Sequence, residues 1–195
     1  KNKNGFKLIS YEPDKNYNRT VVTLLGDPYK ISEAIVEMVG YTTKLIDLNH
    51  HTGEHPRMGA IDVIPFIPIA NIKMKECVKI ATDLGKLLNE KYNIPIFLYE
   101  EAATNPNHVN LADVRRGEFE GMNEKMQNPK FYPDFGKNVN HPTAGATAVC
   151  AREPLIAYNI SLGTKDITIA DNIARAIRHS NGGFRYIKAR SANIE

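Results

Sequence analysis

The stretch KMKECVKIATDLGKLLNEKYNIPIFLY, residues 73–99, says most about the fold of this chain. Its first part places apolar residues three or four positions apart, which is the spacing of an amphipathic helix with one buried face. We expect that helix to span about Lys73–Lys91. The residues that follow, Ile94–Tyr99, are almost continuously apolar and predict a buried strand.

Working outward from this stretch, strands and helices alternate, but some strands follow one another directly. Strands are expected at residues 6–9, 19–25, 62–69, 144–151, 155–162 and 184–187, and helices at 31–46, 111–126 and 167–177. Pro65 and Pro68 interrupt the third of these strands, which we therefore expect to be irregular or at a sheet edge. Because strand pairs occur beside strand–helix alternation, the predicted class is α+β.

The composition describes a globular chain with a weak charge imbalance. It has 195 residues, 42% hydrophobic and 24% charged, with a net charge of +3. The basic residues are scattered and not interleaved with aromatic residues, so we expect no nucleic-acid partner. No apolar run approaches the about 20 residues of a membrane span, so we expect no membrane partner. Cys77 and Cys150 are too few for a disulfide framework and are expected to be packed residues in a cytoplasmic protein.

The segment HHTGEHPRMG, residues 50–59, concentrates the side chains most suited to catalysis. Imidazole moves protons near neutral pH. Gly53 and Pro56 bracket Glu54 and His55, so this piece is not a regular helix, and such backbone tends to display functional side chains.

Two other interpretations of these histidines stay open. His51 and His55 have the four-residue spacing of paired zinc ligands, although the missing helix and the position of Glu54 argue against zinc. Alternatively, His50 and His51 cap the preceding helix and His55 only solvates a loop.

Two further features suit a small ligand. The loop FYPDFG, residues 131–136, continues through Asn138, Asn140 and His141 to TAGAT, residues 143–147. Its flat aromatics, amides and exposed glycine backbone suit a planar heteroaromatic ligand, and equally a surface loop with packed aromatics. Arg19 at the start of a strand could hold a carboxylate in a bidentate fork, or could be an ordinary surface residue.

These segments together resemble the formiminotransferase family. The stretch GEHPRMGAID, residues 53–62, followed by PFIP, residues 65–68, resembles the family signature. Further matches in the same order are NRT (18–20), YEEAA (99–103), RRGEFE (115–120), PDFG (133–136), GAT (145–147), AR (151–152) and LIAYNI (155–160). The resemblance covers essentially the whole chain, but Ala144 replaces a Trp of some members and Cys150 a Gly of many.

The resemblance implies two ferredoxin-like subdomains with antiparallel or mixed sheets covered by helices. Residues 1–153 would form the amino-terminal subdomain without its first strand and helix, and residues 154–195 would begin the second subdomain. The start without Met is what we expect of a piece of a larger protein. The family also suggests a homodimer or larger assembly, with folate bound between the two subdomains.

The resemblance further implies transfer of a formimino group from N-formimino-L-glutamate to N5 of tetrahydrofolate, in histidine degradation. Tetrahydrofolate would be the co-substrate, with no metal. The family's catalytic histidine matches His55, which is therefore the expected general base. Arg19, Glu54, Arg57 and Asp62 are expected to support it, and Glu54 or Arg57 would orient the imidazole or hold a substrate carboxylate.

The family's folate-contacting stretch falls on ten consecutive positions. These are Gly136, Lys137, Asn138, Val139, Asn140, His141, Pro142, Thr143, Ala144 and Gly145. Two other functions stay open: an enzyme that uses 5-formyltetrahydrofolate, by formyl transfer or ring closure, and a folate-binding module without catalysis.

Overall fold

The computed structural model describes residues 5–192 and divides into two compact units, residues 1–154 and 155–195. Residues 1–4 and 193–195, where the two expected domains begin and end, lie outside the described residues.

The larger unit begins with an antiparallel hairpin of strands β1 (Phe6–Asp14) and β2 (Arg19–Gly26). Strand β1 is longer than the expected residues 6–9, because its polar second half also pairs with β2. The connection is therefore short. Tyr17 N–H donates to Asp14 Oδ1 at 3.0 Å, and Asn18 adopts a φ of 45°, which Asn tolerates better than most residues.

The second sheet is parallel, with strand β5 (Thr147–Ala151) between β3 (Val63–Phe66) and β4 (Ile96–Glu100). Strand β3 lies at an edge, as its prolines predict, because Pro65 has no N–H to donate to a second neighbour. Residues of β5 and nearly all of β4 are buried whichever way they point. This sheet therefore needs cover on both faces.

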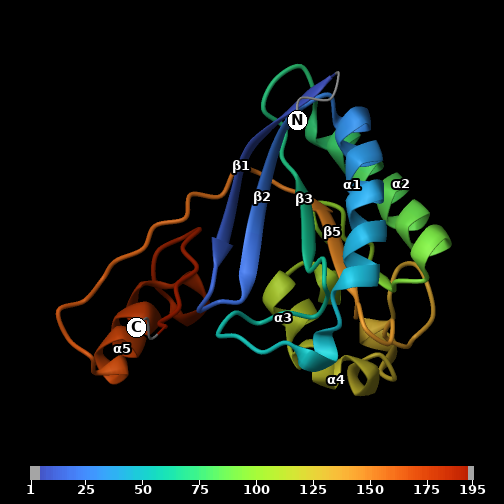
Figure 1. Cartoon of the computed structure of the whole chain (residues 1–195). Coiled ribbons are helices and arrows are strands. Elements are labelled where there is room, and N and C mark those ends of the chain that lie inside the picture. The colour runs from blue at the N-terminus through green and yellow to red at the C-terminus, as the bar shows by residue number, and fades with distance from the viewer. Residues whose placement is uncertain (1–4, 193–195) are drawn as a thin grey trace. The chain divides into compact units, whose positions relative to one another are not determined.

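Helices α1 (Pro28–Leu45) and α2 (Met74–Tyr92) provide the cover on one face (Figure 1). Both agree with the expected helices at 31–46 and 73–91. Their buried apolar side chains form one core cluster with alternate strand residues such as Ile96, Leu98 and Val149. The period of two along each strand thus divides the sheet between two cores.

Helices α3 (Leu111–Arg115) and α4 (Glu118–Lys125) contribute to the second cluster, where Met122 packs with Phe97 of β4. The sequence predicted one helix over residues 111–126, and that prediction is wrong. Arg116, which caps α3, has an extended ψ of 129°, and Gly117 follows it with a left-handed φ of 93°, so that α4 starts in a new direction. Within residues 5–192 there are also four short 3-10 turns: η1 (Leu48–His50), η2 (Pro106–His108), η3 (Pro129–Phe131) and η4 (His179–Asn181).

The smaller unit contains helix α5 (Ile167–Ile177), which has the predicted bounds. Asp166 caps it by accepting a hydrogen bond from Thr168 N–H at 2.9 Å. The strands expected at residues 155–162 and 184–187 are wrong: the first has no ladder, and Phe184 forms only a bridge with Arg178. A strand needs a partner for its N–H and C=O groups, and the described part of this unit offers none.

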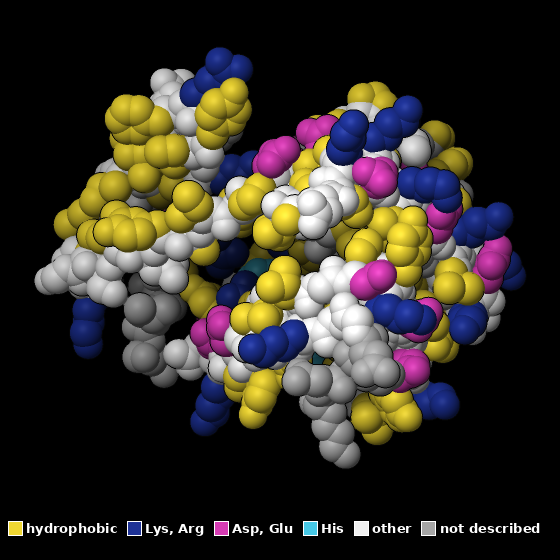
Figure 2. Space-filling view, turned by 90° about the horizontal axis from the view of Figure 1, so that it is seen from above, with side chains coloured by type: hydrophobic (Ala, Val, Ile, Leu, Met, Phe, Trp, Pro, Cys, Tyr) yellow, Lys and Arg dark blue, Asp and Glu magenta, His cyan; other side chains and the backbone are white. Residues whose placement is uncertain are grey.

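The α+β class is confirmed by the antiparallel hairpin, the parallel sheet and the helices that cover it. Cys77 and Cys150 are both buried, as expected, and burial raises the pKa of the Cys150 thiol to about 12. Within residues 5–192, no helix combines the length and the apolar character needed to cross a bilayer. On the right-hand part of the face shown in Figure 2, Lys and Arg side chains lie among Asp and Glu side chains.

Candidate functional site

The histidine segment, residues 50–59, follows helix α1 and has a largely irregular backbone. Helix α1 is capped by Ile46, whose N–H donates to Thr42 O, so neither His50 nor His51 caps it. The expected capping role is therefore wrong for both residues. Residues 51–57 form no helix, as Gly53 and Pro56 predict.

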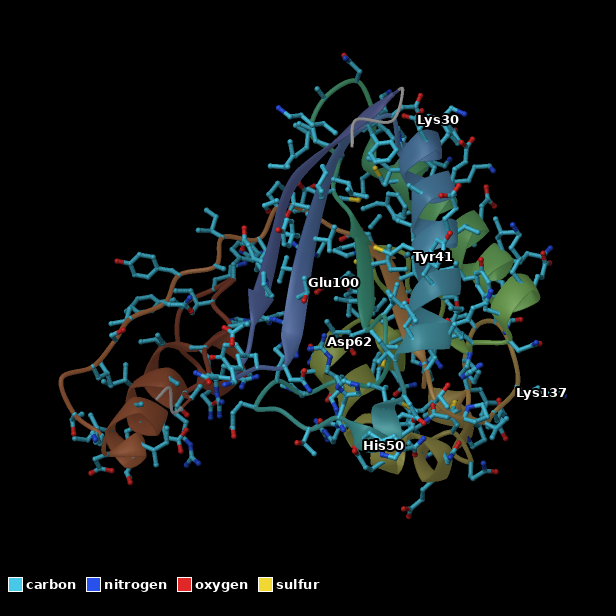
Figure 3. All side chains as sticks on the ribbon, viewed as in Figure 1. Lys30, Tyr41, His50, Asp62, Glu100 and Lys137 are labelled. Atoms are coloured by element: carbon cyan, nitrogen blue, oxygen red, sulfur yellow. The ribbon has the colours of Figure 1, made fainter. Side chains whose placement is uncertain are left out.

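His50 and His51, which precede His55 in the sequence, each have a neighbouring side chain as a partner. The His50 side chain is 80% exposed and lies 3.8 Å from Asp47 Oδ2 (Figure 3). His51 Nδ1 lies 3.2 Å from Asn18 Nδ2. Among residues 5–192, no group of three or more His, Cys, Asp or Glu side chains has a geometry suited to a metal ion.

The hairpin turn of β1 and β2 packs against the segment just before His55. Asn18 Nδ2 donates to Thr52 O at 2.7 Å, and Glu54 N–H donates to Asn16 O at 3.2 Å. A Cβ on Gly53 would lie 2.7 Å from the carbonyl oxygen of Tyr17, closer than side-chain carbon atoms approach. Gly53 is thus required by this close approach.

His55 is half-buried and lies against an aromatic ring. The Tyr17 and His55 rings meet edge to face, with centroids 6.1 Å apart and planes at 77°. On the same tyrosine, the Arg19 guanidinium lies 5.2 Å from the ring centroid. Arg19 itself is exposed. The hairpin therefore places the exposed cation of Arg19 and the ring of the predicted base against the same tyrosine, an arrangement suited to an anionic ligand.

Arg57 is held by the amino-terminal end of α4. Its Nη1 lies 2.9 Å from Glu118 Oε2 and 3.0 Å from Glu120 Oε2, and its Nη2 lies 2.6 Å from Glu120 Oε1. Nη2 also donates to His51 O at 3.0 Å. Hydrogen bonding with Glu120 raises the pKa of Arg57 and lowers that of Glu120.

Asp62 fixes the turn that follows Arg57 (Figure 3). Its Oδ1 accepts a hydrogen bond from Met58 N–H at 2.9 Å, and its Oδ2 pairs with Arg115 Nη2 at 2.6 Å. Burial raises the pKa of the Asp62 carboxyl, and the nearby Arg115 opposes that change. Asp62 thus supports the histidine segment by accepting a hydrogen bond from the backbone of Met58.

The histidine segment and the expected folate-contacting stretch cross at two glycines. Gly59 and Gly145 form an antiparallel bridge. Ala60 N–H donates to Ala144 O at 2.9 Å, and Ala146 N–H donates to Met58 O at 2.9 Å. The structure thus brings the family signature and the end of the predicted folate stretch together.

The stretch of residues 136–145 divides into two parts. Asn140 is buried: its N–H donates to Asn123 Oδ1 at 2.7 Å, and its Nδ2 donates to Phe119 O at 2.9 Å. His141 Nδ1 accepts hydrogen bonds from the N–H groups of Thr143 and Ala144. Burial lowers the pKa of His141, which agrees with a neutral ring that accepts at Nδ1.

Residues 136–139 lie elsewhere. A Cβ on Gly136, with φ of 104°, would lie 2.5 Å from Asn89 Nδ2 at the carboxyl-terminal end of α2. Figure 3 shows Lys137 well away from Asp62. Residues 140–145 are therefore the part of the stretch that the fold joins to the histidine segment.

The aromatic loop before this stretch is held by a buried contact between a histidine and a carboxylate. His108 Nδ1 lies 3.2 Å from Asp134 Oδ2, and the two side chains are 1% and 8% exposed. Asp134 Oδ2 also accepts a hydrogen bond from Leu98 N–H at 2.8 Å. Burial disfavours the charged carboxyl, but the hydrogen bonds from His108, Thr104 and Leu98 outweigh it and lower the pKa of Asp134. Sequence reasoning missed His108.

The other residues that sequence reasoning did not assign to the site are Arg115, Glu118 and Glu120. Their signal was present, since all three lie in RRGEFE, one of the segments that resembles the family. With Thr52, Gly53, Arg57 and Gly117, the two glutamates line an open polar hollow of about 360 Å³.

Comparison with known proteins agrees with these segments. The family model described as "Formiminotransferase domain, N-terminal subdomain" matches residues 1–152. A glutamate formimidoyltransferase of Streptococcus pyogenes serotype M1 is 49% identical over 98% of this chain and 64% of its own length. One from Thermoplasma acidophilum is 42% identical over 94% of this chain and 61% of its own length.

A formimidoyltransferase-cyclodeaminase of Dictyostelium discoideum is 43% identical over 94% of this chain, but over only 35% of its own length. The chain thus spans less than two thirds of each of these relatives.

Proposed function

This chain belongs to the formiminotransferase family, and we propose that it transfers a formimino group from N-formimino-L-glutamate to N5 of tetrahydrofolate. The products would be glutamate and 5-formiminotetrahydrofolate, as a step of histidine degradation. The observation that carries this proposal is the crossing at Gly59 and Gly145, since it joins the segment of His55 to part of the folate stretch.

The chemistry requires a base. N5 of tetrahydrofolate attacks the formimino carbon, an N5–C bond forms, and N5 gives up its proton. The bond between that carbon and the glutamate nitrogen then breaks, and the leaving nitrogen takes up a proton. A single imidazole can accept the first proton and return it to the leaving nitrogen. We assign this role to His55, and the scheme requires no metal.

We assign the substrate carboxylates to the hairpin. Arg19 is exposed, and its guanidinium lies over the Tyr17 ring, which meets the His55 ring edge to face. A planar guanidinium binds a carboxylate through two parallel hydrogen bonds. In this arrangement Arg19 holds formiminoglutamate close to His55.

We assign tetrahydrofolate to residues 136–145, with residues 140–145 closest to the histidine segment. Asn140 forms hydrogen bonds to Asn123 and Phe119 of α4, and His141 accepts hydrogen bonds within the loop. These contacts hold this part of the loop in place. A fixed backbone with amide groups suits the donors and acceptors of a pterin ring. The folate contacts of Gly136, Lys137, Asn138 and Val139 belong to the same proposal.

The cellular setting is part of the proposal as well. Both cysteines are buried free thiols, which suits a reducing cytoplasm. A homodimer or larger assembly, and the assignment of residues 1–153 and 154–195 to the two family subdomains, are also proposed.

The decisive test replaces His55 by Ala and measures formimino transfer to tetrahydrofolate. We expect the rate to fall about 100- to 10,000-fold, the usual contribution of a general base. His50→Ala is the matched control, because this nearby histidine is mostly exposed and pairs only with Asp47 at 3.8 Å in the described structure. A near wild-type rate for His55→Ala contradicts the assignment of the base.

The donor and the binding of folate separate the remaining functions. We expect wild-type protein to use formiminoglutamate better than N-formylglutamate, and the reverse preference indicates an enzyme of 5-formyltetrahydrofolate. Titration with 5-formyltetrahydrofolate that shows binding, together with no turnover of either donor, indicates a folate-binding module.

A further inference from the structure

Most hydrogen-bond donors of the Arg57 guanidinium already have acceptors within the protein. Four of its five N–H donors point at the carboxylates of Glu118 and Glu120 and at the carbonyl of His51. The fifth donor, Nε, is buried and has no acceptor among the described residues. A substrate carboxylate would have to displace Glu120 to reach this arginine.

The backbone of Arg57 is held by the same short segment. Its N–H donates to Glu118 Oε2 at 3.3 Å, and its carbonyl accepts a hydrogen bond from Phe119 N–H at 2.9 Å. Glu118 has a φ of 54° and follows Gly117 at 93°. A left-handed conformation is uncommon for a non-glycine residue and persists only where surrounding contacts enforce it.

The same segment also holds the second motif. The carbonyl of Phe119 accepts a hydrogen bond from Asn140 Nδ2 at 2.9 Å. A Cβ on Gly145 would lie 3.0 Å from Cδ2 of the Phe119 ring. Residues 118–120 therefore contact both the histidine segment and the loop of residues 140–145.

We propose that Glu118 and Glu120 are positioning residues that hold Arg57, and through it present His55 in one orientation toward residues 140–145. This rests on the proposed function, in which His55 is the base. Arg57 then acts on the base through the backbone and binds no substrate carboxylate, which remains the task of Arg19. Of the two roles that the sequence left open for Arg57, this keeps the orienting one.

The two roles for Arg57 predict different kinetics. Misplacing a catalytic group by about 1 Å costs on the order of 100-fold in rate. We expect Glu120→Gln to lower kcat about 10- to 100-fold and to leave KM for formiminoglutamate within about twofold. If Arg57 instead binds the donor carboxylate, removal of its competitor Glu120 lowers KM and leaves kcat near the wild-type value.

Arg57→Lys provides the second variant. It keeps the positive charge but loses the planar fork that fits two carboxylates, so we expect kcat to fall as in Glu120→Gln. A wild-type kcat in Arg57→Lys contradicts the proposal. Asp83→Asn is the control, because it also neutralises a carboxylate in an ion pair, Lys79 Nζ to Asp83 Oδ2 at 2.6 Å, but within helix α2 and away from Arg57. Thermal unfolding checks that every variant is folded.

The outcomes also separate this proposal from the proposed function. Loss of transfer in His55→Ala, together with wild-type kcat in Glu120→Gln, overturns the positioning role and leaves the function standing. Wild-type transfer in His55→Ala overturns the base assignment itself. A direct readout that needs no turnover is the imidazole ¹H–¹⁵N spectrum of His55, which we expect to shift in Glu120→Gln and not in Asp83→Asn.

Discussion

Gly59 and Gly145 face each other across an antiparallel bridge at which two segments, distant in the sequence, come too close for side chains. A Cβ on Gly59 would overlap the carbonyl oxygen of Ala146, and one on Gly145 would overlap the carbonyl oxygen of Met58. The two glycines allow the neighbouring hydrogen bonds of this crossing to form. The candidate site therefore depends on the absence of two side chains as much as on the presence of His55.

Gly145→Ala is expected to destabilise the protein by about 3 kcal/mol, because it adds steric overlap to a left-handed backbone. The φ of Gly145 is 68°. Urea unfolding measures the change. Gly121→Ala is the control: an added Cβ there meets no atom within 4 Å, and alanine favours helix α4 by about 0.5–1 kcal/mol. Equal effects of the two substitutions would contradict the close crossing.

Asp134→Asn is expected to cost about 2 kcal/mol at neutral pH, because it replaces the charged acceptor of the buried hydrogen bonds from His108 and Leu98. The folded-state pKa of Asp134 lies below the ordinary value of 3.8. Its contribution to stability is therefore complete above about pH 4 and is lost as the pH falls through the folded-state pKa.

Unfolding free energies measured down through pH 4 test this. The loss of stability on acidification should be smaller in Asp134→Asn than in wild type. An identical pH dependence of the two proteins would show that the Asp134 carboxyl is not stabilised in its charged form. The exposed pair of Lys79 and Asp83 gives the comparison, since such pairs contribute about 0–1 kcal/mol.

Neither thiol should react with a water-soluble disulfide reagent at pH 8 while the protein is folded. Cys77 and Cys150 are 2% and 0% exposed, and burial raises the pKa of both thiols. The thiolate is the reactive form, so access and ionisation act in the same direction. Both thiols should be labelled after unfolding in guanidinium. Rapid labelling of native protein at Cys150 would mean that the core between β5 and its covering helices opens.

Limited proteolysis should cut first within residues 155–166. This stretch has neither helix nor strand and is exposed throughout, whereas the preceding strand β5 is buried. Mass spectrometry should find a fragment that ends close to Pro154, the last residue of the larger unit, and circular dichroism should find that fragment folded. Early cuts inside β5 or α2 would contradict the division into two units.

Local patterns in the sequence predicted the helices that bury one apolar face and the strands that are buried on both faces. Helix α2 was expected at residues 73–91 because its apolar face repeats every three or four positions, and α5 was expected with its observed bounds. Residues 155–162 are also rich in apolar residues, but they form no strand. A strand depends on a neighbouring strand as well, and the local sequence does not specify one. The break at Gly117 was missed because a single glycine is compatible with a helix until its φ is known.

The candidate site rests on two kinds of signal in the sequence. The resemblance pointed to His55, to Arg57 and to the stretch that ends at Gly145, and local chemistry suggested Arg19. The sequence carried no sign that Arg57 is engaged by Glu118 and Glu120, because that contact depends on how α4 packs beside the histidine segment. Long-range ion pairs of this kind depend on tertiary packing.

The order β3-β5-β4 has a consequence for how the protein is made. The middle strand of the parallel sheet is the last of the three in the sequence, and β3 and β4 do not pair with each other. A chain that has left the ribosome only as far as residue 140 can form the β1–β2 hairpin, α1 and α2, but it lacks the parallel sheet that the two helices cover. Apolar helix faces must then stay exposed until Thr147–Ala151 emerges, and non-local pairing of this kind is slow to form. Residues 147–151 therefore complete the parallel sheet of the larger unit and end the period in which its apolar helix faces are most open to aggregation.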